Sequence, residues 1–424
     1  MRLSIYHNKT LVGFLDSISG GLTFRYAPEF LAQARYPLSL SLPLQEDPFP
    51  PKPTTRFFDG LLPEEDERTR MARYLQISST STAGLLAALA GDCVGNLTIL
   101  APSDTLELLL ARSSYQLLSA GEFQALLKND LDLITRISSE NRLSIPGAQS
   151  KIGLYCKTEL SSQNPQDWYI PQGLAASTHI IKPDSRNYPL SSLNEYLCTR
   201  LAQTADIETA EVILLDEPTE HRTVLLARRF DRVRSSDGFV ERLYQEDFCQ
   251  ALSYPSQRKY EQDGGPGFSE ILDVLRSETS EPPRDSLRFA QIFLFNYLIG
   301  NCDAHAKNYS LQRTSAGRLR LAPAYDMVST TFYQGLSRNL ALGVAGTYSL
   351  DKITQEQWKQ LCAATGLSWH WLQQLAITLA ETMLQALDDK TMDISLTGYE
   401  QEVRALSDHL HAEIKDRLQV FTKH

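Results

Sequence analysis

"SLRFAQIFLFNYLIGNCDAHAKNYS" (Ser286–Ser310) is the stretch that decides the fold class. Its first part is apolar nearly all round, which predicts a helix that is buried on every side. The pair Gly300-Asn301 is typical of a helix end. The loop that follows places an Asp, a His, a Lys and an Asn within six residues, and a core helix needs none of these to end. The stretch therefore predicts the central helix of a helical lobe, followed by a functional loop.

Asp303 and Asn308 in this loop have the D-x-x-x-x-N spacing of a kinase catalytic loop. In phosphoryl transfer such an Asp accepts the proton of the substrate hydroxyl, and such an Asn holds a magnesium ion. Asp326 ends "RLRLAPAYD", a short predicted strand, which is where a kinase carries its second magnesium-binding Asp. An Asp and an Asn behind a helix are also ordinary turn residues, so a structural interpretation stands beside the catalytic one.

A second set of candidates lies upstream. Lys182 ends the predicted strand "STHIIK", and Glu195 begins the predicted helix "NEYLCTRLAQTA". In kinases a strand Lys pairs with a helix Glu and binds ATP phosphates, although a Lys at a strand end is also commonly solvated. The turn "SIPGAQSK" (Ser144–Lys151) offers backbone amides that could bind phosphate, and it also fits an ordinary hairpin turn.

Length and composition limit the alternatives. A chain of 424 residues is too long for one ordinary core and predicts two or three domains. A net charge of −10 argues against binding nucleic acid by bulk electrostatics. The N-terminus lacks the apolar segment of a signal peptide, so we expect a cytoplasmic protein that does not associate with membranes. The cysteines have no metal-ligand spacing and predict reduced thiols; they are Cys93, Cys156, Cys198, Cys249, Cys302 and Cys362.

We expect three regions along the chain. Residues 1–100 are predicted to be β-rich, with two strands in "RLSIYHNKTLVGFL" and an extended or turned connector at "DPFPPKPTT" (Asp47–Thr55). Residues 101–240 contain a strand–strand–helix–strand–strand series. Residues 241–424 are predicted to be mostly helical, with a capping box at Thr354 and Gln357 and a long amphipathic tail helix.

Several stretches together resemble the HipA family, the serine/threonine kinase toxins of bacterial toxin–antitoxin pairs. They keep their order over about residues 140–330, and the β-rich start resembles the N-terminal subdomain of that family. The stretches are "RLSIPGAQSKIGL", "THIIKP", "NEYLC", "RRFDR", "QEDFCQAL", "KYEQDGGPG", "NYLIGNCDAHAKNYSL" and "LAPAYDMVS". The combined pattern is highly specific, whereas each motif alone is not.

The resemblance implies an α+β, two-lobed fold like that of protein and lipid kinases, with ATP and Mg²⁺ between the lobes. It implies a β-rich N-terminal lobe (101–240) with an extra β subdomain (1–100), and a mostly helical C-terminal lobe (241–424). Asp303 resembles the catalytic base, Asn308 and Asp326 resemble the magnesium ligands, and Ser144 resembles the serine that the family autophosphorylates. The positions that resemble ATP-binding residues are Pro146, Gly147, Ala148, Gln149, Ser150, Lys151, Lys182, Arg228, Arg229, Phe230, His305, Ala306, Lys307, Asn308, Tyr325 and Asp326.

The resemblance also implies partners. These are a small helix-turn-helix antitoxin of the HipB type and a protein substrate of the aminoacyl-tRNA synthetase class. The helix after Thr354 carries few basic residues, so operator DNA is expected only indirectly, through the antitoxin. Two departures from the family pattern are Arg228, where an acidic residue can occur, and Pro146, which replaces a small residue. Two other functions remain open: a catalytically weak kinase-like module that acts by binding an antitoxin–operator complex, and a small-molecule or lipid kinase.

Overall fold

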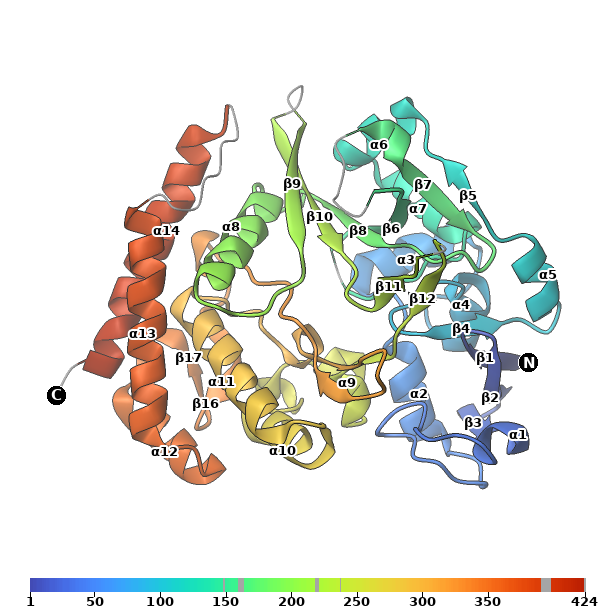
Figure 1. Ribbon diagram of the computed structural model, residues 1–424, viewed down its shortest axis with the longest axis horizontal. Helices are drawn as coiled ribbons and strands as arrows, with labels where there is room; N and C mark the ends of the chain where they lie inside the picture. Colours follow the sequence, from blue (N-terminus) through green and yellow to red (C-terminus); the bar gives the residue numbers. More distant parts are fainter. Residues whose placement is uncertain (148, 159–163, 218–220, 237, 390–397, 423–424) are drawn as a thin grey trace.

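The computed structural model describes residues 1–147, 149–158, 164–217, 221–236, 238–389 and 398–422. Its elements form three neighbouring regions (Figure 1). The N-terminal sheet lies at one end, below part of a larger sheet that extends to the middle of the molecule, and a group of helices forms the other end, where the chain finishes. Every pairing between the named strands of the described residues is antiparallel.

The N-terminal region is a four-stranded sheet with its own apolar core. The two strands predicted in the first fifteen residues are present as a hairpin. Its inward positions, such as Leu3 and Ile5, alternate with more exposed ones, as a half-buried strand requires. The strands in spatial order are β3 (Gly21–Tyr26), β2 (Thr10–Ile18), β1 (Arg2–His7) and β4 (Leu97–Leu100). The helices are α1 (Pro28–Leu31), α2 (Pro51–Asp59), α3 (Glu65–Tyr74) and α4 (Thr82–Leu89).

The prediction for Asp47–Thr55 was wrong, because helix α2 begins inside that connector at Pro51. Proline is tolerated in the first turn of a helix, where backbone N–H groups have no intrahelical partner and φ near −65° is already helical. Phe57 and Phe58 at the other end of α2 are buried in the N-terminal core, and their burial stabilises the helix.

The middle region is a six-stranded sheet. Its strands in spatial order are β5 (Ser114–Leu117), β7 (Trp168–Gln172), β6 (Ile152–Cys156), β8 (His179–Pro183), β10 (Arg222–Arg228) and β9 (Val212–Glu217). The predicted series corresponds to β6, β8, α8 (Ser191–Thr204), β9 and β10. Strands β5 and β7 were not predicted, nor were the helices α5 (Leu106–Ala111), α6 (Ala120–Leu127) and α7 (Leu131–Glu140).

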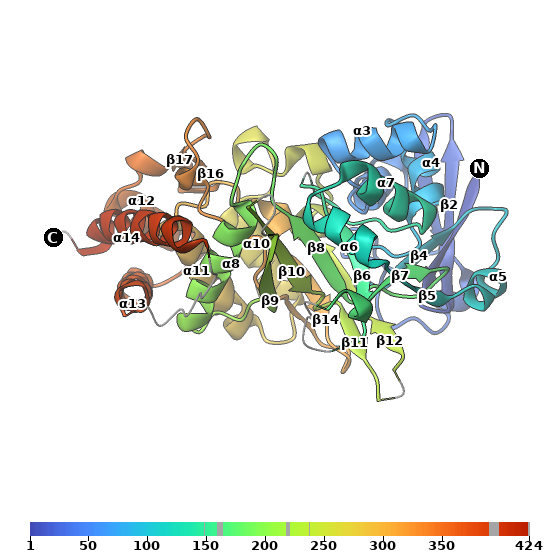
Figure 2. The same ribbon diagram turned by 90° about the horizontal axis from the view of Figure 1, so that it is seen from above.

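The two faces of this sheet belong to different cores. Along β10, Val224 and Leu226 point into a core shared with α6 and α7, whereas Leu225 points into the core that contains α8. This alternation is the period of two of a β-strand. The core on the α8 face continues into the C-terminal helices, so α8 joins the middle sheet to the helical region (Figure 2).

The C-terminal region is built around α11 (Pro282–Leu298), whose second half is almost entirely buried, as predicted. The helix ends before Gly300, which has φ +69°. That left-handed conformation favours glycine. The predicted capping box at Thr354 and Gln357 is present at α12 (Gln355–Thr365), and the predicted tail helix is α14 (Glu400–Thr422). Helix α13 (Trp369–Asp388) packs between α11 and α14 and was not predicted.

A small sheet connects the helical region to the middle one. Its strands are β13 (Gln245–Asp247), β14 (Ser310–Arg313) and β15 (Leu319–Leu321). The loop between α11 and β14 contains Asp303 and Asn308, and Asp326 follows β15. Each of these two loops therefore begins at the end of a helix or strand, which fixes the position of its first residues. Within the described ranges, no helix is both long and apolar enough to cross a bilayer.

Candidate active site

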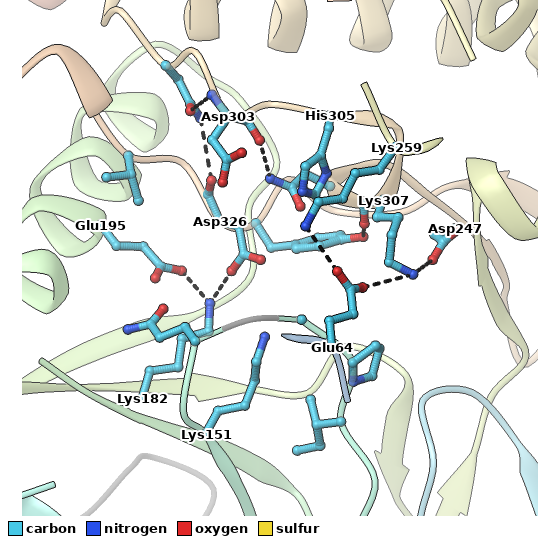
Figure 3. Close-up of a pocket in the computed structure, with 18 of the residues that line it drawn as sticks. Glu64, Lys151, Lys182, Glu195, Asp247, Lys259, Asp303, His305, Lys307 and Asp326 are labelled. Carbon is cyan, nitrogen blue, oxygen red and sulfur yellow. Dashed lines mark hydrogen bonds and ion pairs between the residues drawn. The ribbon is translucent and has the colours of Figure 1, made fainter. Parts of the chain in front are cut away.

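A cleft of about 800 Å³ lies where the middle sheet meets the loop after α11. Its volume falls in the range typical of small-molecule sites. The cleft is lined by most of the residues that the sequence analysis selected (Figure 3). These are Pro146, Gly147, Gln149, Lys151, Lys182, Arg228, Arg229, Phe230, Asp303, His305, Lys307, Asn308, Tyr325 and Asp326. Ser150 and the fully buried Ala306 are not among the lining residues. Ala148 lies outside the described residues.

Lys182 is a buried cation in the cleft that pairs with two carboxylates. It extends from β8, its Nζ lies 2.7 Å from Oε1 of Glu195, and it also forms an ion pair with Asp326. Glu195 comes from the second turn of α8, so three separate elements meet at one ammonium group. This is the pairing of strand Lys and helix Glu found in kinases, with a carboxylate of the second lobe added.

The cations and anions around Lys182 shift one another's pKa. Burial would lower the pKa of Lys182, but Asp326 and Glu195 raise it above its usual value. Burial would raise the pKa of Asp326, but Lys182 and Lys151 hold it well below its usual range. Burial raises the pKa of Glu195 in spite of the nearby ammonium group. Lys182 is therefore charged in this arrangement, and Asp326 is an anion.

Asp326 adopts an unusual backbone conformation, with φ +55°. A non-glycine residue in the left-handed region is uncommon, and such residues concentrate at functional sites. Asn301 is buried beside it, and its Nδ2 donates to Asn296 Oδ1 at 2.9 Å and to the carbonyl of Asp326 at 3.5 Å. Asn301 Oδ1 also accepts from the backbone N–H of Asp303 at 3.1 Å. Asn301 was predicted only as a helix end, and its link between the main chains of Asp303 and Asp326 was not predicted.

The catalytic-type loop is held by its own hydrogen bonds. Asn308 Nδ2 donates to the carbonyl of Asp303 at 2.9 Å, which leaves its amide oxygen as the atom that could bind a metal ion. The carboxylate of Asp303 is exposed to the cleft and accepts a hydrogen bond from the hydroxyl of Tyr260. Tyr260 was part of a stretch that resembles the family, but it was not selected as a site residue.

Lys307 does not point into open solvent. Its Nζ lies 2.7 Å from Asp247 Oδ2 and 3.5 Å from Glu64 Oε1, and these carboxylates raise its pKa although burial opposes the shift. Lys259 Nζ lies 3.0 Å from the other oxygen of Glu64. Glu64, Lys259 and Asp247 all line the cleft, and none of them was predicted.

The segment Ser144–Lys151 lies along one wall of the cleft. Gly147 has φ +114°, and a Cβ atom at this position would lie 2.5 Å from Lys151 Nζ, so a larger residue would displace the lysine. Ser144, which resembles the autophosphorylated serine, is completely buried, and its hydroxyl donates to the carbonyl of Leu61 at 2.6 Å. In this conformation Ser144 does not line the cleft.

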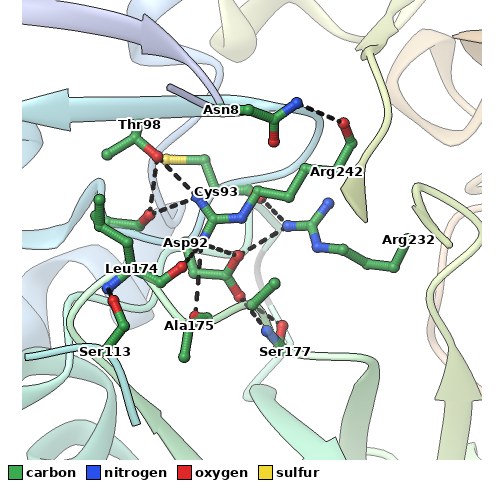
Figure 4. Close-up of polar contacts among 12 residues, drawn as sticks. Asn8, Asp92, Cys93, Thr98, Ser113, Leu174, Ala175, Ser177, Arg232 and Arg242 are labelled. Carbon is green, nitrogen blue, oxygen red and sulfur yellow. Dashed lines mark hydrogen bonds and ion pairs between the residues drawn. The ribbon is translucent and has the colours of Figure 1, made fainter. Parts of the chain in front are cut away.

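The stretch expected at the adenine, Arg228 to Phe230, begins at the last residue of β10. The guanidinium of Arg229 lies in a buried ion cluster, where it donates to Asp231 at 2.9 and 2.7 Å. Arg229, Arg232 and Arg242 surround Asp92 in that cluster, at 3.5, 2.9 and 3.1 Å. Figure 4 shows Asp92 with Arg232 and Arg242. A backbone contact remains the role that Arg229 can have toward a nucleotide.

The side chains in the cleft include groups of the kinds that could bind a magnesium–triphosphate. Lys151 and Lys182 are cations beside the glycine turn, and the oxygens of Asn308 and Asp326 are of the type that Mg²⁺ prefers. His305 Nδ1 is buried without a hydrogen-bond partner among the described residues, so this nitrogen could form a hydrogen bond with a bound molecule. No cluster of three or more His, Cys, Asp or Glu side chains that could hold a metal occurs in the described part of the chain. A magnesium ion would need phosphate oxygens and waters to complete its coordination.

The two-lobed α+β fold, with a paired strand Lys facing an Asp-x-x-x-x-Asn loop across a cleft, defines the class of protein- and lipid-kinase-like enzymes. Two family models identify the family within that class. The HipA N-terminal domain matches residues 3–100, and the HipA-like C-terminal domain matches residues 143–390. The chain therefore belongs to the HipA family, which confirms the resemblance described above.

Known relatives agree with this assignment. The chain is 32% identical over 394 residues to "Putative kinase Y4mE" of Sinorhizobium fredii, covering 91% of this chain and 90% of the relative. It is 26% identical over 403 residues to "Serine/threonine-protein kinase toxin HipA" of Shewanella oneidensis, covering 91% and 88%. The fold matches a HipA solved in complex with HipB and operator DNA from the same organism, with a TM-score of 0.82, 24% identity and coverage of 99% and 98%. The expected fold class is confirmed, and the chain is a kinase of this family.

Proposed function

We propose that this protein is an ATP- and Mg²⁺-dependent serine/threonine protein kinase that acts as the toxin of a toxin–antitoxin pair. The observation that carries the proposal is the meeting of Lys182, Glu195 and Asp326 in the cleft that Asp303 also lines. Lys182 and Glu195 lie on consecutive elements, whereas Asp303 and Asp326 come from a distant part of the chain, and phosphoryl transfer gives a physical reason for all of them.

Each group has a role that follows from its chemistry. Asp303 would accept the proton of the acceptor hydroxyl, and Lys182 and Lys151 would bind phosphate oxygens. Asn308 and Asp326 would hold Mg²⁺, which neutralises charge on the transferred phosphoryl group.

Phe230 and the backbone of Arg228 and Arg229 would bind the adenine. We also propose Ser144 as an autophosphorylation site, with Gly147, Gln149, His305 and Lys307 close to the nucleotide.

The proposed partners are a HipB-like helix-turn-helix antitoxin and a protein substrate of the aminoacyl-tRNA synthetase class. The antitoxin is supported by the structural relative, which was solved with HipB and operator DNA. Operator DNA would be reached through the antitoxin. A cytoplasmic location and the division of the chain at residues 100 and 240 also remain proposals.

A two-part experiment tests this function. The purified protein is incubated with γ-labelled ATP, with Mg²⁺ or with EDTA, and any phosphosite is mapped by mass spectrometry. Expression in a bacterial host is then compared with and without a candidate HipB-like helix-turn-helix protein from the same source. We expect Mg²⁺-dependent labelling, and growth arrest that the second protein relieves. Nucleotide binding without transfer would instead favour the module that acts by binding an antitoxin–operator complex.

A further inference from the structure

The segment Leu61–Glu64, which lies between α2 and α3 in the N-terminal region, is in direct contact with the cleft. It belongs to the part of the chain that matches the HipA N-terminal domain, whereas the predicted site residues belong to the other matched part or lie close to it. This contact links a separate β-rich region to the site of the proposed chemistry.

The main chain of the segment holds the phosphate-loop candidate. The N–H of Glu64 donates to the carbonyl of Gly147 at 3.3 Å, and Pro63 and Gly147 pair as a parallel β-bridge. The carbonyl of Leu61 accepts from the hydroxyl of Ser144 at 2.6 Å. The loop is therefore fastened at both Ser144 and Gly147 to the same short segment.

The side chain of Glu64 reaches across the cleft to the other wall. Its two carboxylate oxygens lie 3.0 Å from Lys259 Nζ and 3.5 Å from Lys307 Nζ (Figure 3). The side chains of Glu64 and Lys259 are each 11% exposed, and that of Lys307 is 5% exposed. Charges this little exposed are weakly screened by solvent, so their positions are coupled strongly. Burial would raise the pKa of Glu64, but Lys307 and Lys259 lower it to about 2, which keeps it ionised.

Both lysines are tied to the catalytic-type loop. The carbonyl of Lys259 accepts from the N–H of Ala306 at 3.3 Å, and Lys307 lies within the loop itself, next to Asn308. A carboxylate that fixes both ammonium groups therefore fixes the loop that carries Asp303. Glu64 joins this loop to Gly147 through one residue.

We propose that Glu64 is a positioning residue of the kinase site, through which the N-terminal region aligns the phosphate loop with the catalytic loop. This inference rests on the proposed phosphotransfer function. Glu64 touches no reacting atom in the proposal; it acts through Lys259, Lys307 and Gly147. Through Glu64, the N-terminal region would help to align the two loops of the cleft.

The kinetic test compares Glu64→Gln, Glu64→Asp and Glu29→Gln in the full-length protein. Glu64→Gln keeps the shape but removes the charge, so Lys259 loses its nearest carboxylate and Lys307 is held by Asp247 alone. We expect kcat to fall at least tenfold with KM for ATP changed less than threefold, and Glu64→Asp to recover at least a third of the wild-type kcat. Glu29 is exposed on α1, and its variant removes the same charge from the same region and should behave as wild type.

Lys259→Met supplies a second route to the same conclusion. If Glu64 acts through Lys259, the double variant Glu64→Gln/Lys259→Met should be no slower than the slower single variant, because residues that act as a unit are not additive. A rise in kcat for Glu64→Gln would mean that Glu64 restrains the site, and would overturn the proposal. Unchanged kcat and KM would also overturn it.

Hydrogen exchange separates this proposal from the proposed function. Without nucleotide, Glu64→Gln should speed amide exchange in residues 303–308 and 144–147, whereas exchange in α13 and in the Glu29→Gln protein should stay as in wild type. Unchanged exchange in both loops contradicts the positioning role even if no kinase activity is found. A wild-type protein that transfers no phosphate, with faster exchange in the variant, contradicts only the proposed function. If Glu64→Gln does not fold, Glu64→Asp and Lys259→Met are measured in the same way.

Discussion

The Nζ of Lys182 lies 2.7 Å from Oε1 of Glu195, and both side chains are almost fully buried. The same ammonium group contacts Asp326, which follows β15 in the sequence. A buried cation between two carboxylates of different lobes has a large desolvation cost. The attraction of Lys182 to Glu195 and Asp326 opposes this cost. In the proposed function, Lys182 also joins the two sides of the nucleotide site.

Lys182→Met should abolish phosphotransfer and weaken the fold. Losing a fixed cation at the triphosphate should lower kcat/KM by a factor of roughly 10² or more. Removing one partner of a buried ion pair typically costs about 3–5 kcal/mol. Kinase assays and urea denaturation measure the two effects. Lys157→Met is the matched control, because Lys157 is exposed just beyond β6 of the same sheet and should change neither. Full activity in Lys182→Met would contradict the role assigned to Lys182.

Ser144→Asp should weaken nucleotide binding. The Ser144 hydroxyl is buried and donates to Leu61, whereas a carboxylate cannot donate and cannot stay buried without a partner. The loop Ser144–Lys151 should therefore lose its contact with Leu61 and move. The Kd for ATP, measured by calorimetry, should rise at least tenfold. Ser144→Ala loses only one hydrogen bond, so it should cost about 1 kcal/mol of stability and keep transfer to an external acceptor. Equal ATP affinity in Ser144→Asp and wild type would show that the loop position does not control binding.

Asp92→Asn should destabilise the protein strongly. Asp92 is buried among Arg229, Arg232 and Arg242, and it accepts from Ser177 at 2.6 Å. Removing its charge leaves these guanidinium groups with too few anions, at a cost of about 3–5 kcal/mol in the free energy of unfolding.

Asp16→Asn is the control for that measurement. Asp16 pairs with Arg2 at the surface, where an ion pair contributes only about 0–1 kcal/mol. Urea denaturation of both variants should separate a buried cluster from a surface pair. A similar decrease in the free energy of unfolding for both variants would contradict this account. It would show that the ion cluster around Asp92 does not hold the N-terminal region against the residues that follow β10.

Glu246 should make stability depend on pH. Burial raises its pKa to about 7, even though Ser39, Tyr244 and the N–H of Leu40 donate to it. The titratable and charged groups near it are Tyr244, Asp247, Tyr26 and Arg313. Between its usual pKa and pH 7 the unfolded chain loses this proton while the folded chain keeps it. The contribution to stability should therefore fall by about 3 kcal/mol as pH rises through that window, and stay constant above it.

Glu246→Gln tests this effect, because glutamine stays neutral at all pH values. The free energy of unfolding of the variant relative to wild type should rise between pH 5 and pH 7.5. Glu241→Gln, in the exposed middle position of β12 (Val240–Arg242), should show no such change. A difference between Glu246→Gln and wild type that does not vary with pH would contradict the burial argument.

Local patterns in the sequence were enough to predict much of the fold and the site candidates. Lys182 and Glu195 lie on consecutive elements, and Asp303 and Asn308 lie in one loop, so their spacing is visible in the chain. Helix α11 was predicted because nearly every residue of its second half is apolar. Helix α13 was overlooked although Ser368 supplies an N-cap that binds the N–H of Trp371.

Contacts between distant segments could not be predicted in this way. Glu64 meets Lys259 and Lys307 only because the N-terminal region folds against the cleft, and no spacing along the chain records that contact. Arg229 was selected as part of the stretch near the adenine. Its partner Asp231 is only two residues away, but no local pattern indicates that this pair is buried against Cys93 of the N-terminal region. The short edge strand β5 exposes most of its residues and has little apolar pattern to recognise.

The most direct test of the account compares wild type with Asp303→Ala in labelled ATP and Mg²⁺. A general base contributes roughly 10²–10⁴-fold to rate, so the variant should incorporate at least a hundredfold less phosphate, at Ser144 and in any protein acceptor. Its melting temperature and ATP affinity should stay close to those of wild type, because Asp303 is exposed and its backbone holds the loop. A variant that labels as fast as wild type would contradict the assignment of Asp303 as the catalytic base.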